Sequence, residues 1–143
     1  MKLTDLEPQF YRYETRIEAY EVVDGTWDDQ TKAYKVADGR SWDEAGRPTK
    51  EVTDPREYLC NVDTLQEAQG IMFLCPKCYR DNNGSVGTHR CPLPFAGRGV
   101  DPVKNQWNAT GSGYHDLSTT PSYLIVGGCG WHGYITNGEV SIL

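Results

Sequence analysis

Two short motifs in this sequence each hold a pair of metal-binding side chains separated by two residues. The first, C-P-K-C at residues 75–78, follows an apolar run, and the second, C-G-W-H, spans residues 129–132. Two ligands at this spacing can point into one tight turn, and four cysteine and histidine ligands complete the tetrahedral shell of a structural zinc ion. We therefore predict a structural zinc site whose ligands are Cys75, Cys78, Cys129 and His132.

A second ligand set stays open, because His89 and Cys91 form an H-x-C motif between the two pairs. These two residues could replace the pair at residues 129–132, or could lie beside the metal as partners of its ligands. We rank the 129–132 pair first, since the H-x-C motif has no glycine that would let the backbone curl around an ion. His89 and Cys91 are kept as the alternatives.

The residues around the motifs predict a mainly β fold similar to a zinc ribbon. Apolar segments at residues 71–74 and 122–126 have the length and composition of buried strands, and each leads into one motif. Asn137-Gly138, between two segments of strand-forming residues, is a strong β-hairpin signal. The predicted fold class is therefore a β-rich α+β domain with two metal-binding knuckles and one short helix.

That helix is expected just before the first apolar strand. Thr64 and Glu67 form a capping box, and Gly70 is placed to end the helix. By contrast, residues 79–84 have the composition of a turn, whereas a redox-active C-x2-C pair opens a helix. The sequence therefore favours metal binding over thiol–disulfide chemistry at the C-P-K-C motif.

The whole chain of 143 residues is long enough to form one domain with a hydrophobic core. We expect a β-rich N-terminal elaboration at residues 1–56 and the zinc-bearing part at residues 57–143. Strand-forming residues dominate residues 10–23, for which residues 32–36 are the predicted partner strand. Residues 41–55 have the composition of a polar loop or a long hairpin.

The charge and the cysteine content exclude several classes of protein. A formal net charge of −6 leaves no basic stripe to displace counterions from a phosphate backbone, so nucleic acid is not an expected partner. No segment has the length and apolarity of a membrane span, and no secretion signal precedes the first strand. We expect no membrane association and a place in the cytoplasm, where an odd number of cysteines, five, argues against a disulfide framework.

Residues 92–121 form a glycine-rich segment with no clear helix or strand pattern. Segments of this length without structure of their own are usually functional or disordered. We expect either a lid over the zinc-bearing sheet or a recognition loop whose exposed side chains anchor a partner. The candidate partner-binding residues are Trp107, Tyr114 and Arg98.

The sequence lacks the motifs of common zinc enzymes and hydrolases. The H-E-x-x-H of metalloproteases, the H-x-E of zinc deaminases and the G-x-S-x-G nucleophile elbow are all absent. Four cysteine and histidine ligands would also close the metal shell, whereas a catalytic zinc keeps one position open. No catalytic residue is therefore predicted, and a zinc-dependent hydrolase is kept only as an alternative function.

One larger pattern runs through the C-terminal half, from about residue 64 onward. It combines an apolar strand with C-P-x-C, a central tryptophan, a P-S pair before a strand, and C-x-W-H-G followed by N-G; its residues are 73–78, Trp107, 117–123 and 129–138. In this pattern the chain resembles an uncharacterised family, a domain of unknown function, of small bacterial and phage zinc-binding proteins. The C-G-W-H-G form is similar to the phage branch. The resemblance implies that the four knuckle residues bind metal, and it implies no activity.

From these observations we expect a zinc-stabilised phage-type protein that acts by binding another protein, with a host defence or regulatory component as the target. An acidic surface suits a basic protein partner. The alternative is a virion protein, a head decoration or tail accessory, in which glycine-rich loops and tyrosine-rich strands serve subunit packing. The expected location is the cytoplasm of the bacterial host or, in the alternative, the virion, and self-association is compatible with both.

Overall fold

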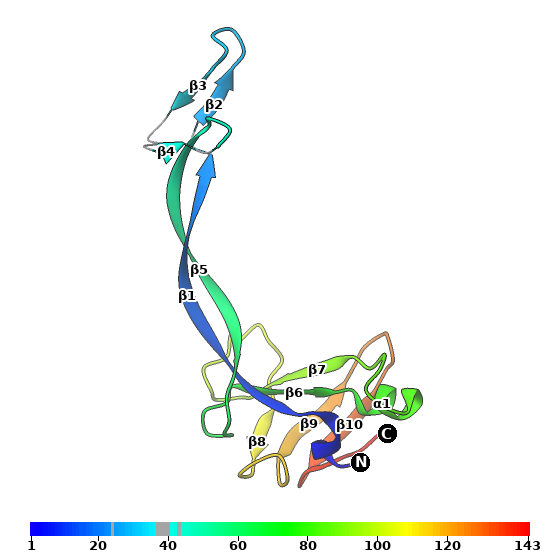
Figure 1. Cartoon of the computed structure of the whole chain (residues 1–143). Helices are drawn as coiled ribbons and strands as arrows, with labels where there is room; N and C mark the ends of the chain where they lie inside the picture. Colours follow the sequence, from blue (N-terminus) through cyan, green and yellow to red (C-terminus); the bar gives the residue numbers. More distant parts are fainter. Residues whose placement is uncertain (24, 37–40, 43) are drawn as a thin grey trace. The chain divides into compact units, whose positions relative to one another are not determined.

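The computed structural model of the chain describes residues 1–23, 25–36, 41–42 and 44–143. It is mainly β, with two antiparallel sheets and a single short helix in the described part, so the predicted fold class is confirmed. The chain divides into two compact units, which we call the body (Met1–Tyr13 with Leu59–Leu143) and the insert (Glu14–Tyr58). Its elements are η1 (Leu3–Leu6), β1 (Gln9–Val23), β2 (Gly25–Asp28), β3 (Ala33–Val36), β4 (Ser41–Trp42), β5 (Pro48–Asn61), β6 (Gly70–Leu74), α1 (Pro76–Asn82), β7 (Arg90–Pro94), β8 (Asn108–Thr110), β9 (Ser118–Leu124), β10 (His132–Thr136) and β11 (Glu139–Val140) (Figure 1).

Strands of both sheets build the body. A five-stranded sheet has the order β4-β5-β1-β6-β7, and β6 is antiparallel to both of its neighbours. A four-stranded sheet has the order β11-β10-β9-β8. The core of the body draws on both sheets and on η1, and its buried members are Leu3, Leu6, Phe10, Leu65, Ala68, Ile71, Phe73, Leu74, Cys75, Cys91, Leu93, Phe95, Leu117, Trp131, Ile135 and Val140.

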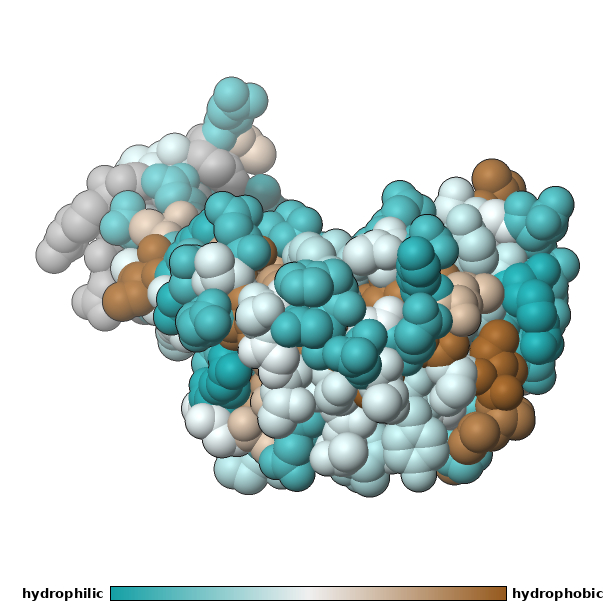
Figure 2. All heavy atoms as spheres, turned by 90° about the horizontal axis from the view of Figure 1, so that it is seen from below, coloured by the Kyte–Doolittle hydropathy of each residue, from teal (hydrophilic) through white to brown (hydrophobic). Residues whose placement is uncertain are grey.

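Aromatic rings connect the two sheets through this core. Phe73 of β6 meets Trp131 edge to face, with ring centroids 5.8 Å apart, and Tyr123 of β9 stacks on Trp131 at 5.1 Å. The buried indole of Trp131 also donates from Nε1 to the carbonyl of Ser141, so its polar atom is satisfied. The face in Figure 2 carries mostly hydrophilic and near-neutral residues, with hydrophobic ones scattered among them.

The first thirteen residues belong to the body. The backbone N–H of Leu3 donates to Gly138, and the N–H of Val140 donates to Met1, so the N-terminus packs against the C-terminal hairpin. Both chain ends lie in this part of Figure 1. The body therefore contains residues from both sides of the insert.

The single helix lies later in the chain than the sequence predicted. Thr64 Oγ accepts a hydrogen bond from the N–H of Glu67, as a cap would, but the chain makes only one turn because Gln69 already pairs with β1. Helix α1 instead follows Cys75, in the segment predicted as a turn, so the sequence argument against a redox-active C-x2-C pair, which depended on that turn, is wrong. No helix in the described part of the chain is long and apolar enough to cross a membrane.

The strands of the insert pair differently from the prediction. β3 pairs with β2 in a hairpin, whereas the partner of β1 is β5, which occupies part of the predicted polar loop. Charged residues and a proline occupy the exposed positions of β5, so the apolar alternation that identifies a strand is missing there.

Gly70 serves a close approach between strands rather than the end of a helix. A Cβ at this position would lie 2.4 Å from the ring and hydroxyl of Tyr11 and 2.9 Å from the carbonyl oxygen of Leu93. The Tyr11 side chain is 2% exposed, so it has little room to withdraw. Only glycine therefore lets β1 and β6 pack in this arrangement.

We expect Gly70→Ala to lower the free energy of unfolding by about 1–3 kcal/mol, the usual cost of overpacking. Gly113→Ala is the matched control, because neither glycine has a left-handed backbone and the nearest atom at Gly113 is the movable His115 ring, at 3.3 Å. Urea unfolding of both variants measures the difference. Equal losses would contradict the close approach at Gly70.

Candidate metal centre

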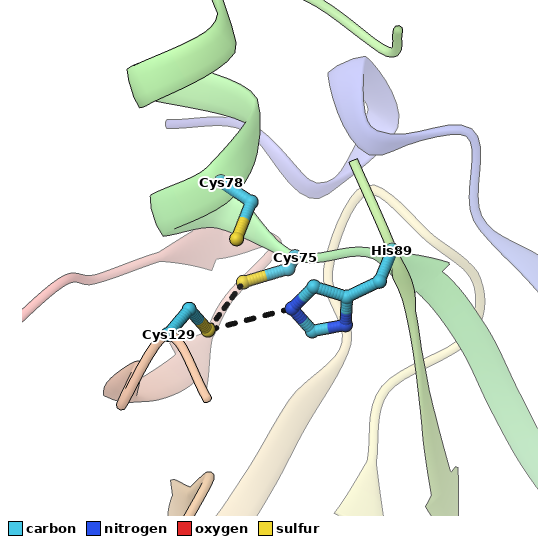
Figure 3. Close-up of side chains that lie close together, drawn as sticks. All are labelled: Cys75, Cys78, His89 and Cys129. Carbon is cyan, nitrogen blue, oxygen red and sulfur yellow. Dashed lines mark hydrogen bonds between the residues drawn. The ribbon is translucent and has the colours of Figure 1, made fainter. Parts of the chain in front are cut away.

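Four side chains from three separate segments converge at one edge of the body (Figure 3). Cys75 follows β6, Cys78 lies in the first turn of α1, His89 precedes β7, and Cys129 lies in the loop between β9 and β10. Their ligand atoms all lie within 4.8 Å of one another. These four residues can hold a metal ion.

Two distances from the sulfur of Cys129 match those of a tetrahedral shell. For metal–sulfur bonds of about 2.3 Å and metal–nitrogen bonds of about 2.0 Å, two sulfurs lie about 3.8 Å apart, and sulfur and nitrogen lie about 3.5 Å apart. The sulfurs of Cys75 and Cys129 are 3.7 Å apart, and His89 Nε2 is 3.4 Å from the sulfur of Cys129. The side chains therefore need little movement to bind an ion between them.

Helix α1 brings the first two cysteines together. Cys75 is its N-cap, Pro76 takes the first helical position with its fixed φ, and Cys78 takes the third. An N-cap side chain faces the third helical residue, which is the geometry that a capping serine uses to reach a backbone N–H. Here the same geometry points two sulfurs at one site.

The register of β6 and β7 positions His89. Leu74 lies opposite Arg90 in this ladder, and one step further the N–H of Cys75 donates to the carbonyl of His89 at 2.9 Å. The histidine is thereby held directly across from the first cysteine. It is exposed, whereas Cys75 is buried, so the site opens to solvent on the histidine side.

A glycine-rich turn presents Cys129. The N–H of Gly130 donates to the carbonyl of Gly127 at 3.1 Å, and Gly128 and Gly130 have φ angles of 54° and 67° that other residues rarely adopt. Lys77 Nζ donates to the carbonyl of Cys129 at 2.7 Å, which ties this turn to α1. The ammonium group therefore places a positive charge beside the backbone of Cys129.

The thiols of the group differ in pKa. Burial acts to raise the pKa of Cys129, but hydrogen bonds from the Trp131 backbone N–H, His89 and the other two cysteines outweigh it and lower the pKa from 9.0 to about 7. Desolvation, followed by hydrogen bonding to Cys129 and Cys75, raises the pKa of Cys78 from 9.0 to about 12. Cys129 is therefore the residue that offers a thiolate near neutral pH, and a bound metal must displace the proton of Cys78.

The structure places His132 outside this group. It begins strand β10, and its Nε2 lies 3.0 Å from the hydroxyl of Ser122 on β9. Trp131 explains the position, because its ring is fixed in the core and its carbonyl accepts from Ile125, so the chain is already extended before His132. The C-G-W-H motif therefore leaves its turn before the histidine is reached.

Cys91, the other alternative ligand, lies in the core behind the group. It is 1% exposed and sits opposite Phe73 in the ladder of β6 and β7. Burial, followed by the charge and hydrogen bond of Cys75, raises the pKa of the Cys91 thiol well above its usual range. Among the described residues the structure thus joins three first-choice ligands with His89, and leaves Cys91 and His132 outside.

The three candidate partner-binding residues all make contacts within the body. Trp107 stacks on Tyr123 at 4.9 Å, and Tyr114 stacks on Phe10 at 4.2 Å while its hydroxyl accepts from the Phe10 N–H. Arg98 donates to the carbonyls at positions 65 and 68, both at 2.8 Å. These contacts hold the glycine-rich segment against the rest of the body.

No family model, curated protein or solved structure matches this chain. The resemblance to an uncharacterised family therefore stays a prediction. The function has to be inferred from the geometry of the side chains, and the group of Cys75, Cys78, His89 and Cys129 is the starting point.

We expect His89→Ala to lose tightly bound metal and His132→Ala to retain it, because only His89 reaches the sulfurs. Native mass spectrometry after purification under reducing conditions counts the bound ions, and Cys91→Ser is a further control that should keep its metal. Metal loss in His132→Ala with retention in His89→Ala would contradict the ligand set.

Proposed function

We propose that the body is a zinc-stabilised scaffold and that the insert binds another protein. The observation that carries the first part is the convergence of Cys75, Cys78, His89 and Cys129 at tetrahedral distances. Three thiolates and one imidazole are a common ligand set of structural zinc sites.

The chemistry of the donors favours zinc over other ions. Sulfur-rich tetrahedral sites select zinc or iron–sulfur chemistry, whereas magnesium and calcium require oxygen ligands. One histidine among three cysteines suits a single zinc ion, which has no geometric preference of its own and accepts the shape that the protein offers. The ammonium group of Lys77 then offsets the net negative charge of a zinc bound by three thiolates.

Zinc would cross-link segments that are distant in sequence. Cys75 and Cys129 are 54 residues apart in the sequence, and an ion bound by both would connect the end of β6 to the loop before β10. Those are the strands that carry Phe73 and Trp131 into the core. The ion would therefore hold the two sheets of the body together at one edge, in addition to their hydrophobic contact.

The same site is poorly suited to catalysis. Four protein ligands fill a tetrahedral shell, so no position is left for a substrate or an activated water. The group contains no carboxylate among the described residues that could act as a general base. A structural role is therefore favoured over the hydrolase alternative.

Large apolar side chains that are exposed on the insert support the proposal that it binds protein. Of its side chains with described burial, only Pro48 and Thr49 are buried. Ile17, Trp27 and Trp42 are 77%, 51% and 60% exposed. A two-stranded ribbon is only marginally stable alone, and large exposed apolar side chains mark interaction sites.

Zinc should raise the thermal unfolding midpoint, and the rise should shrink as the pH is lowered from 8 to 6. Above pH 7 Cys129 is largely a thiolate, and below it a proton must be displaced there as well as at Cys78, so binding weakens as the pH falls. At a free zinc concentration of 1,000 times Kd the stabilisation is about 4 kcal/mol. Differential scanning calorimetry with and without a chelator measures it, and an unchanged midpoint after zinc removal would contradict the structural role.

A photo-crosslinking residue in place of Trp42 should form a discrete protein adduct in cells that naturally make this chain. The same residue in place of Val86, which is 89% exposed in the body, is the matched control and should form none. Adducts are identified by mass spectrometry. No adduct at position 42, or equal adducts at both positions, would contradict binding through the insert.

A further inference from the structure

We propose that the insert pairs with the insert of a second copy of this chain, strand β1 against strand β1, antiparallel and with a two-fold axis at Ile17. This goes beyond the proposed function, because it assigns a partner to the β1 edge, whereas Trp42 lies on β4, on the other side of β5. Three features of β1 carry the inference: an open edge, charges that complement one another in one register, and an exposed apolar residue at the centre of that register.

Strand β1 has an edge that no described strand covers beyond its first residues. It lies between β5 and β6 in the sheet, but β6 pairs only with the first three residues of β1. The N–H of Tyr13 is then taken by the side chain of Gln69, at 2.8 Å. From residue 14 to residue 23 this edge offers backbone donors and acceptors that can pair with another strand.

The opposite edge of the ribbon is less suited to pairing. β5 has β4 as its outer neighbour over Pro48 and Thr49, and further along it contains Pro55. Proline has no backbone N–H, and prolines in edge strands discourage pairing with other chains. Strand addition is therefore expected at β1.

Charge complementarity selects a second β1 as the added strand. With Ile17 opposite Ile17, Arg16 of each copy lies opposite Glu18 of the other, so two opposite-charge pairs form across the axis. A shift by two residues in one direction sets Glu18 against Glu18. In the other direction it sets Arg16 against Arg16 and Glu14 against Glu18. Like charges directly opposite are unfavourable, so both of these registers are disfavoured. A register centred on Thr15 would also pair opposite charges, but it overlaps only residues 14–16 of the open edge, whereas the register centred on Ile17 overlaps residues 14–20.

The side chains at this centre are accessible. Ile17 is 77% exposed, and the charged side chains of Arg16 and Glu18 are 56% and 39% exposed although each already has an ion pair within the insert. Pairing would bring the two Ile17 residues about 4.5–5.5 Å apart at their Cα atoms. The two ribbons would then form one four-stranded sheet, which meets the usual requirement for a stable sheet.

Sedimentation velocity of the zinc-loaded full chain tests the pairing. The wild type is expected to sediment at twice the 16.1 kDa of one chain, with the dimer fraction rising with concentration. Ile17→Lys and Ile17→Glu should each be monomeric, because the two-fold axis would place two like charges directly opposite each other. An equimolar mixture of the two variants should form dimers again, because opposite charges would then meet. Val126→Lys, at an 89% exposed apolar site of the body, is the matched control and should stay dimeric.

A wild type that stays monomeric at all concentrations, or an Ile17→Lys variant that dimerises like the wild type, overturns the pairing. Two monomeric variants that do not combine when mixed overturn the register at Ile17. Zinc content and near-ultraviolet circular dichroism are recorded for every sample. A folded, zinc-loaded monomer whose residue 42 crosslinks to a different protein rejects only this inference, whereas a zinc-free, folded protein rejects the proposed scaffold.

Discussion

The ladder between β6 and β7 determines both the core and the metal centre of the body. Its register sets Ile71 opposite Leu93, and both side chains are buried. The same ladder, continued by the hydrogen bond from Cys75 to the carbonyl of His89, places an imidazole beside the sulfurs. A slip by one residue would turn the apolar side chains outward and remove the histidine from the site. Hydrophobic burial and the convergence of the four candidate ligands therefore depend on the same register.

The parts of the site that depend on local geometry could be predicted from the sequence. The C-x2-C spacing of Cys75 and Cys78 is sufficient to predict that they lie together, although a helix N-terminus brings them together rather than the predicted tight turn. Cys129 could be predicted because the glycines on both sides of it indicate a tight turn. His89 depends on strand pairing, and its strand is hard to recognise because Pro92 and Pro94 lie in it. Prolines are tolerated there because β7 is the edge of the sheet, a fact that only the topology provides.

The fold could be predicted as a class but not in its connections. Apolar residues identify β6, and Asn137-Gly138 identifies the last hairpin, with φ angles of 49° and 76°. Helix α1 was missed because it is only seven residues long, too short for a periodic pattern. β5 was missed because neither face of it is buried over most of its length. Where burial is absent, the sequence has no apolar pattern from which a strand can be recognised.

The chain leaves the body and re-enters it at neighbouring points, since the N–H of Val62 donates to the carbonyl of Phe10 at 3.0 Å. With respect to the body, the insert is a loop whose two ends are already held together. The entropy of closing a loop grows slowly with its length, by about 0.6 kcal/mol for each doubling. Segments of quite different length and sequence can therefore be exchanged at this position at small thermodynamic cost, so the insert can change without disturbing the folding of the body.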